Sequence, residues 1–197
     1  MNKFEHGVFL ARMQPLHLGH MYMVEKALCE CKTVTIVLGS SNKYFMSRNP
    51  FTLDIRKRWI EGALKESKDI ERINIFCLPD WSLENDTNET IEWGRYLYYN
   101  IVSRIQAKHF TIFYSDKIDI INSWFDETLR ERIYIRHVDR SNVYEGLSAT
   151  KIREAFIHGD KSYLEKYLPK SVLEDYSLIL SNLLILKETH LEDFSMK

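Results

Sequence analysis

The sequence predicts an α/β protein with a Rossmann-like, doubly wound, mainly parallel five-stranded sheet and a C-terminal helical subdomain. Two observations support this fold class. Short apolar and β-branched runs alternate with segments of helical periodicity, which is typical of a parallel sheet covered by helices on both faces. From Ser148 onward every periodic segment has helical spacing.

The first element is the apolar run Gly7–Leu10, bounded by polar residues as in a strand buried on both faces. Similar runs predict the other strands, at residues 33–38, 73–77, 109–114 and 132–137. Helical spacing predicts helices at residues 19–31, 52–63, 86–105 and 118–129. Thr52 is the expected N-cap of the second helix, and Asp86 and Glu89 have capping-box spacing before the third.

The C-terminal part is expected to contain helices at residues 148–157, 162–167 and 170–186, followed by a loosely ordered tail. No repeat or linker divides the chain. We therefore expect a core of residues 1–147 and a helical subdomain of residues 148–197 within one domain.

The composition excludes several classes of partner. The 197 residues include 27 Lys and Arg against 28 Asp and Glu, so no global charge attracts nucleic acid or an acidic membrane. Neither a secretory signal nor a membrane span is recognisable, so a cytoplasmic location is expected. The three cysteines, Cys29, Cys31 and Cys77, lack metal-site spacing, so we expect reduced structural thiols and no metal site in the protein.

A first candidate anion site lies where the first strand turns into the first helix. His17 and His20 are three positions apart and share a helix face, and Gly19 allows close approach. Arg12 can bind phosphate oxygens, and backbone N–H groups at the helix N-terminus favour an anion. Two exposed or capping histidines would be the alternative interpretation.

Two further basic clusters stand at helix starts. Ser148 is the expected N-cap of a helix that carries Thr150, Lys151 and Arg153 in its first turns, although solvated bases on an ordinary capped helix would look alike. Arg48 and Arg56 flank the second helix start, where a solvated basic face is the alternative. Three anion sites fit a triphosphate, and the glycine-rich G-x-x-x-x-G-K-[ST] loop is absent from the sequence.

These residues resemble the nucleotidylyltransferase superfamily, whose signature is H-x-G-H after a Pro. Arg12-Met13-Gln14-Pro15-Leu16-His17-Leu18-Gly19-His20 is similar to the G-R-[FM]-Q-P-F-H-x-G-H of archaeal-type nicotinamide-nucleotide adenylyltransferases. The resemblance continues in order through Gly39-Ser40, Asn49-Pro50-Phe51-Thr52, Ser148-x-Thr150-x-x-Arg153 and Leu168-Pro169.

The resemblance implies transfer of AMP from Mg-ATP to the phosphate of nicotinamide mononucleotide, giving NAD and pyrophosphate. Alternatives are another phosphorylated acceptor such as nicotinate mononucleotide, cytidylyl transfer from CTP, or a nucleotide sensor without turnover. Mg²⁺ would be carried by ATP, and relatives of this type assemble, so a homo-oligomer is expected.

The resemblance also implies roles for individual residues. His17, His20, Arg12 and Arg153 would act on the phosphates in transfer, and the ATP-binding residues would be Gly19, Arg48, Arg56, Ser148 and Thr150. Trp93 would stack on the pyridine ring of the acceptor, with a packed helix residue as the alternative interpretation. Asp80 and Trp81 are further candidates for that pocket.

The chain departs from the family pattern at several positions. Ala11 and Ala149 replace glycines, and Ile55 replaces a Glu before Arg56. Tyr44-Phe45 replaces a Ser-His pair, and Asp116-Lys117 replaces an Asn-containing step. These changes lie in the expected ATP-loop and acceptor regions, so nucleotidyl transfer is a firmer expectation than the identity of the acceptor.

Overall fold

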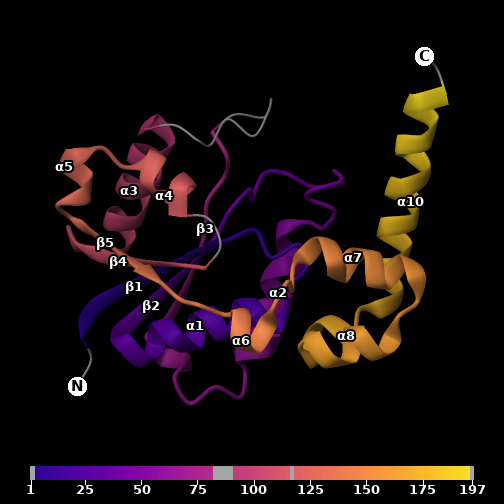
Figure 1. The fold of residues 1–197 in the computed structure, drawn as a ribbon, viewed down its shortest axis with the longest axis horizontal. Helices are drawn as coiled ribbons and strands as arrows, with labels where there is room; N and C mark the ends of the chain where they lie inside the picture. The colour runs from indigo at the N-terminus through magenta and orange to yellow at the C-terminus, as the bar shows by residue number, and fades with distance from the viewer. Residues whose placement is uncertain (1–2, 82–90, 116–117, 196–197) are drawn as a thin grey trace.

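A computed structural model describes residues 3–81, 91–115 and 118–195. In this part of the chain five strands form one sheet in the order β3-β2-β1-β4-β5 (Figure 1). Every neighbouring pair is parallel, which confirms the predicted fold class. The strands are β1 (Phe4–Ala11), β2 (Cys31–Leu38), β3 (Ile73–Cys77), β4 (Phe110–Tyr114) and β5 (Ile133–His137).

Helices cover the two faces of this sheet (Figure 1). One face is covered by α1 (Leu18–Glu30) and α2 (Leu53–Leu64). The other is covered by α3 (Ile91–Ile105), α4 (Ile118–Trp124) and α5 (Glu127–Arg130). The single helix expected at residues 118–129 is therefore two short helices. Asp126 separates them because its carboxylate caps α5, accepting the backbone N–H of Leu129 at 3.0 Å.

The apolar strands build two separate hydrophobic cores. Phe9, Ile36 and Phe113 belong to the cluster on the α1 and α2 face. The residues one position away, Val8, Val37 and Ile112, belong to the cluster on the α3 and α4 face. Successive strand side chains point to opposite faces, so strands covered on both sides must be apolar at consecutive positions.

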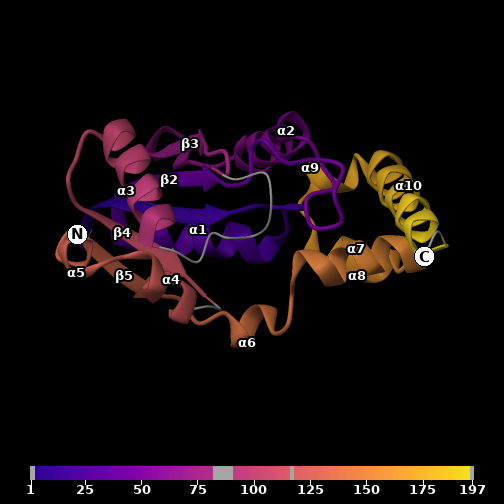
Figure 2. The same ribbon diagram turned by 90° about the horizontal axis from the view of Figure 1, so that it is seen from above.

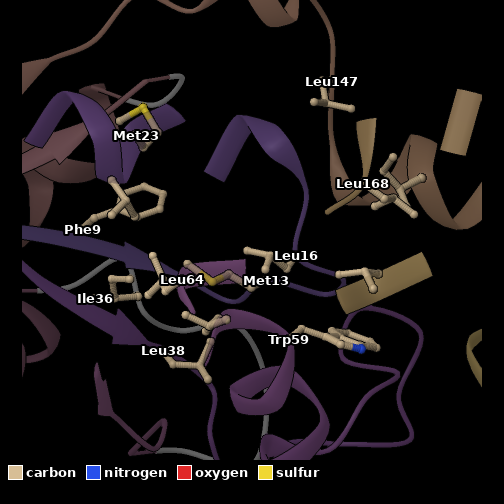
Figure 3. Packing of buried hydrophobic residues seen from close by; sticks show 14 of the residues in the cluster. Phe9, Met13, Leu16, Met23, Ile36, Leu38, Trp59, Leu64, Leu147 and Leu168 are labelled. Atoms are coloured by element: carbon tan, nitrogen blue, oxygen red, sulfur yellow. The ribbon is translucent and has the colours of Figure 1, made fainter. Parts of the chain in front are cut away.

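The remaining helices form a lobe beyond the carboxyl ends of the strands (Figures 1 and 2). After the short α6 (Ser141–Tyr144), which the sequence did not predict, the lobe contains α7 (Ala149–His158), α8 (Lys161–Tyr167), α9 (Lys170–Leu173) and α10 (Tyr176–Ser195). Figure 3 shows Met13 and Leu16 lying between Ile36 and Leu38 on the core side and Leu168 of the lobe. Because these residues share one hydrophobic cluster, the lobe packs firmly against the core.

The C-terminal helix corrects the prediction for residues 170–186. The expected helix is divided into α9 and α10, and α10 continues to Ser195 instead of ending near Leu186. Asp175 lies between the two helices and accepts the indole N–H of Trp59 at 2.8 Å, while Arg58 pairs with the same carboxylate. Residues 187–195 contain no Gly or Pro, so the helix propagates through the segment expected to be loosely ordered.

Other predicted boundaries differ only slightly from the structure. The first strand extends from the predicted residues 7–10 to 4–11, and a 3₁₀ turn at Ile70–Arg72 precedes β3. Thr52 occupies the predicted N-cap position of α2. The capping box at Asp86 and Glu89 lies outside the described residues. The division at residue 147 stays a prediction. Within the described residues, no helix has the length and apolar character that a membrane span requires.

Candidate active site

A candidate site lies at the carboxyl ends of the strands, where the winding direction of the sheet reverses. β1 is followed in sequence by β2 on one side, and it pairs with β4 on the other. A cavity of about 620 Å³ opens at this point, lined by the end of β1, the start of α1, the loop after β2, the end of β4 and the start of α7. Doubly wound sheets bind ligands at such a switch point.

His17 and His20 face this cavity as a stacked pair. His17 is the N-cap of α1, and the two ring centroids are 3.7 Å apart with an interplanar angle of 21°. Residue His17 is 2% exposed, and residue His20 is partly exposed. The predicted shared face is therefore confirmed, and both imidazoles can contact one ligand.

The hydrogen bonding of His20 defines which of its nitrogens can serve a ligand. The backbone N–H of His17 donates to Nδ1 of His20 at 3.3 Å, so Nδ1 is an acceptor and the proton of the neutral ring resides on Nε2. Burial, then the charges of His17 and Arg140, lower the pKa of His20 well below its usual value. In the protein without ligand His20 is therefore a neutral N–H donor at pH 7.

Gly19 is required by the packing above the first turn of α1. A Cβ atom at Gly19 would lie 2.8 Å from Nη1 of Arg140 and 3.0 Å from Nδ1 of His17. In the structure, the groups that closely approach the backbone of Gly19 are the side chains of Arg140 and His17. Gly19 lets the guanidinium of Arg140 lie directly over the helix N-terminus.

Arg12 and Arg153 bring two guanidinium groups to the same part of the cavity. Arg153 donates from Nη1 to the Gln14 carbonyl at 2.8 Å and from Nη2 to Oγ1 of Thr150 at 3.2 Å. Burial, followed by the positive charge of Arg12, lowers the pKa of Arg153. An anion bound beside Arg153 would offset the effect of Arg12 on its charge.

The start of α7 lies beside these two arginines, where the sequence predicts a helix start. We call Arg12, Arg153 and the N-terminus of α7 the cationic wall of the cavity. Ser148 is the N-cap, and its Oγ accepts the backbone N–H of Lys151 at 3.3 Å. Ser148, Ala149 and Thr150 all line the cavity. Arg48 also lines it from the loop after β2 and is exposed to solvent. The structure thus brings the first two candidate anion sites and Arg48 together in one cavity.

Arg56 is the exception among the predicted phosphate ligands. Its side chain is fully buried, and its guanidinium donates to the carbonyls of Arg12 at 2.8 Å, Gly39 at 2.9 Å and Ser40 at 3.1 Å. Burial lowers the pKa of Arg56 to about 10, which keeps it charged at neutral pH. In this position Arg56 does not contact the cavity, and it holds the loops after β1 and β2 instead.

Trp93 lines the cavity from α3 with only 2% of its surface exposed. Its ring meets Trp124 edge-on, with centroids 6.4 Å apart, and lies 5.5 Å from the ring of Tyr96. The adjacent Gly94 permits this packing, because a Cβ there would lie 1.6 Å from the Trp124 carbonyl oxygen. Trp93 is thus a packed residue, as one interpretation of the sequence expects, and it also borders the cavity, while its stacking on a pyridine ring stays a prediction.

Asp80 and Trp81 have different positions. Asp80 is 5% exposed and lines the cavity, whereas Trp81 is 53% exposed and is not among the lining residues. Of the two residues predicted for the acceptor pocket, Asp80 thus lies at the cavity and Trp81 does not, and the acceptor role of Asp80 stays a prediction.

Sequence reasoning missed two functional candidates, Gln14 and Arg140. The Gln14 side chain donates to the Phe51 carbonyl at 3.1 Å and accepts its N–H at 2.9 Å, joining the two loops that carry Arg12 and Arg48. Arg140 lines the cavity beside His20. Arg140 is eight positions before Ser148, so it is not part of the motif at the start of α7. Its position shortly after β5 is the signal that could have identified it as a candidate phosphate ligand.

The departures from the family pattern are spread over different environments. Ala11 and Ala149 line the cavity, where a small side chain leaves room for a ligand. Tyr44 and Phe45 are more than half exposed, with ring centroids 5.7 Å apart. Asp116 and Lys117 lie outside the described residues.

Comparison with known proteins agrees with this arrangement. The cytidylyltransferase-like family model matches residues 8–155. A nicotinamide-nucleotide adenylyltransferase from Pyrobaculum arsenaticum is 30% identical over 172 residues, covering 85% of each chain. One from Thermococcus sibiricus is 34% identical over 170 residues, covering 85% of this chain and 81% of the relative.

Solved structures show the same fold. A bifunctional NMN adenylyltransferase/ADP ribose pyrophosphatase from Francisella tularensis has a TM-score of 0.63 and 28% identity over 79% of this chain, which spans 42% of that protein. A putative nicotinate-nucleotide adenylyltransferase from Vibrio parahaemolyticus has a TM-score of 0.59 at 18% identity, covering 92% of this chain and 96% of that one. The chain therefore belongs to the cytidylyltransferase-like family, together with these nicotinamide-nucleotide adenylyltransferases.

Proposed function

We propose that this enzyme transfers AMP from Mg-ATP to the phosphate of nicotinamide mononucleotide, forming NAD and pyrophosphate. The relatives that match 85% of the chain carry the name of this activity. The cavity of about 620 Å³ has the size of a small-molecule site. Its cationic wall suits a triphosphate, and its aromatic end suits a flat ring.

The observation that carries the proposal is the convergence of His17, His20, Arg12 and Arg153 at the reversal point of the sheet. Two arginines provide forked donors, and a neutral His20 provides an Nε2–H donor. The N-termini of α1 and α7 add backbone N–H groups and favourable dipoles. These groups together match the charge and the hydrogen-bond acceptors of a triphosphate.

The proposed reaction is a direct displacement at phosphorus. An oxygen of the acceptor phosphate bonds to the α-phosphorus of ATP, the bond to the bridging oxygen breaks, and pyrophosphate leaves with the electron pair. Charge grows on the oxygens around the reacting phosphorus and on the leaving group, where His20, Arg12 and Arg153 would stabilise it. A phosphate nucleophile requires no covalent enzyme intermediate, so positioning and electrostatic stabilisation suffice.

Mg²⁺ belongs to the substrate in this proposal. Among the described residues no cluster of three His, Cys, Asp or Glu side chains could hold a metal ion. We assign coordination of Mg²⁺ to the phosphates of ATP, which the cationic wall would bind together with the metal.

The acceptor would occupy the end of the cavity formed by Trp93 and Asp80. A tryptophan surface and a carboxylate both favour a ring that carries a positive charge. Nicotinamide mononucleotide carries such a pyridinium ring on the same ribose as the phosphate that reacts.

The deciding experiment measures pyrophosphate release from Mg-ATP, and in parallel from Mg-CTP, with nicotinamide and nicotinate mononucleotides offered separately. Release from Mg-ATP with the nicotinamide form, with NAD identified by mass, is expected. Release only from Mg-CTP would show that CTP is the nucleotide substrate. Release only with nicotinate mononucleotide would show that this is the acceptor. Tight ATP binding without release for any acceptor would favour a sensor. The cytoplasmic location and the homo-oligomeric state stay predictions.

A further inference from the structure

A buried ion pair lies next to the acceptor end of the cavity. Nζ of Lys43 is 3.1 Å from Oδ2 of Asp80, and their side chains are 6% and 2% exposed. The Lys32–Glu5 pair lies at the amino ends of β1 and β2, and its side chains are 59% and 67% exposed. Removing both charges of a pair from water is costly, so a pair buried beside a binding cavity calls for an explanation.

The loop that carries Lys43 is joined to the segment after β3. The side chain of Asn42 donates to the Asp80 carbonyl at 3.0 Å and accepts the Asp80 N–H at 2.9 Å. The Ser41 N–H donates to the Leu78 carbonyl at 3.1 Å. These bonds hold the Asp80 carboxylate and the Lys43 ammonium in one defined position.

The two members of the pair have different access to the cavity. Asp80 lines it, whereas Lys43 is not a lining residue and lies behind the carboxylate. Among the described lining residues Asp80 is the one carboxylate, while Arg12, Arg48, Arg140 and Arg153 are cations. A ligand thus meets a negative charge at one place, and Lys43 determines how much of that charge it experiences.

The carboxylate is also held near the aromatic end of the cavity. The Tyr96 hydroxyl donates to the Pro79 carbonyl at 3.2 Å, and the Tyr96 ring lies 5.5 Å from Trp93. The negative charge of Asp80 contributes to the raised pKa of Tyr96, after burial. Asp80 and Trp93 therefore belong to one subsite, defined by a ring surface and a compensated negative charge.

We propose that the Lys43–Asp80 pair sets the charge preference for the acceptor ring, with Lys43 as a specificity-determining residue. The inference rests on the proposed function. Asp80 favours a pyridinium ring whose substituent is a neutral amide and disfavours one whose substituent is a carboxylate. Lys43 offsets this effect, so the pair sets the ratio between the two acceptors.

The test compares kcat/KM for nicotinamide and nicotinate mononucleotides at saturating Mg-ATP. In Lys43→Gln the carboxylate loses the ammonium that pairs with it, so the preference for nicotinamide should rise about tenfold, a change expected when one charge acts on another in a protein. In Asp80→Asn the ammonium remains alone, so the ratio should shift about tenfold toward nicotinate. The double variant Lys43→Gln/Asp80→Asn should return close to the wild-type ratio.

Controls separate charge selection from a structural role. Lys32→Gln and Glu5→Gln remove the same charges from the exposed pair and should leave the ratio unchanged. A merely structural pair would lower kcat/KM for both acceptors by the same factor. Equal losses, or shifts in the same direction in both single variants, would overturn the inference.

Melting curves show whether each single variant folds. If both unfold, the reversed pair Lys43→Glu/Asp80→Lys keeps a buried ion pair and places the cation at the cavity, so the ratio should move toward nicotinate. An unchanged ratio in that variant would also overturn the inference. Wild-type enzyme that turns over neither acceptor would overturn the proposed function itself, whereas turnover with charge-independent ratios overturns only the role of the pair.

Discussion

Two imidazole rings stacked 3.7 Å apart cannot both carry a charge cheaply. The lowered pKa of His20, caused first by burial and then by His17 and Arg140, expresses this cost. The neutral His20 ring can still donate its Nε2–H to an anion in the cavity, so hydrogen bonding to a phosphate does not require the imidazolium.

The lowered pKa of His20 predicts a dependence of stability on pH. The folded protein binds fewer protons at His20 than the unfolded chain, so this contribution is fully present above pH ~6.5 and declines as the pH falls below that value. The wild-type melting temperature should therefore fall more between pH 7.5 and 5.5 than that of His20→Asn. His158→Asn, at an exposed position of α7, should keep the wild-type slope. Parallel slopes for all three proteins would contradict the prediction.

His20 should contribute more to turnover than to binding of ATP. In His20→Ala we expect kcat to fall about 100-fold, because the donor acts on charge that develops during transfer. The dissociation constant for Mg-ATP, measured by titration calorimetry, should change much less, since Arg12 and Arg153 remain. Unchanged turnover in a folded variant would remove His20 from the mechanism.

At the scale of elements, α2 organises a site that it does not line. Its Arg56 donates to carbonyls in the connections after β1 and β2, and Gln14 joins the first of these connections to Phe51 at the start of α2. The positions of Arg12 and Arg48 therefore depend on a helix whose own side chains are outside the cavity. A buried cation serves here as a multiple donor to backbone carbonyls.

Arg56→Met should destabilise the protein strongly. The substitution leaves buried carbonyls at Arg12, Gly39 and Ser40 without their donor, so we expect the free energy of unfolding to fall by about 3 kcal/mol in urea titrations. Lys57→Met, an exposed position on the same helix, should change it little. If Arg56→Met retains full stability and loses only ATP affinity, Arg56 acts directly on phosphate.

At the scale of the whole molecule, the site is divided between the sheet and the C-terminal lobe. Thr150 and Arg153 belong to α7 and Ser148 caps it, while Arg12 lies in the connection after β1 and the two histidines lie at the start of α1. The lobe is held to α2 through Asp175, which pairs with Arg58 and accepts from Trp59, and through the Ser171 hydroxyl, which donates to the Trp59 carbonyl at 2.8 Å.

Asp175→Ala should therefore affect both stability and nucleotide binding. The buried Trp59 indole would lose its acceptor, at a cost of about 1–3 kcal/mol in unfolding free energy. KM for Mg-ATP should rise more than KM for the acceptor, because the lobe carries the residues proposed to bind ATP. Asp175→Asn retains a carbonyl oxygen for the indole and should be milder. Equal increases of both KM values would contradict this coupling.

The expected homo-oligomer is testable on α10. Leu183 and Leu186 are buried, whereas Leu184 and Ile185 are 41% and 52% exposed, so part of the apolar stretch packs internally. Light scattering should give a multiple of the 23.5 kDa chain mass, and Ile185→Glu should lower it. A wild-type mass equal to one chain would contradict the expectation.

The sequence by itself determined the alternating βα order, the two helix starts that carry Arg12, His17 and Ser148, and the family resemblance. These features depend on local periodicity, capping residues and motif spacing, which are properties of neighbouring positions. Even the error at α10 was local, because helix propensity extended through residues expected to be loosely ordered.

Only the tertiary structure decided which charged side chains face the cavity. Arg56 and Arg153 are both basic residues in the first turns of helices, yet one is enclosed by carbonyls of two distant loops and the other lines the site. In the sequence, Lys43 is an ordinary residue of the loop after β2. Its ion pair with Asp80 becomes visible only in the fold, where the segment after β3 lies beside this loop. Burial and charge pairing arise from segments far apart in the chain, so spacing along the sequence does not determine them.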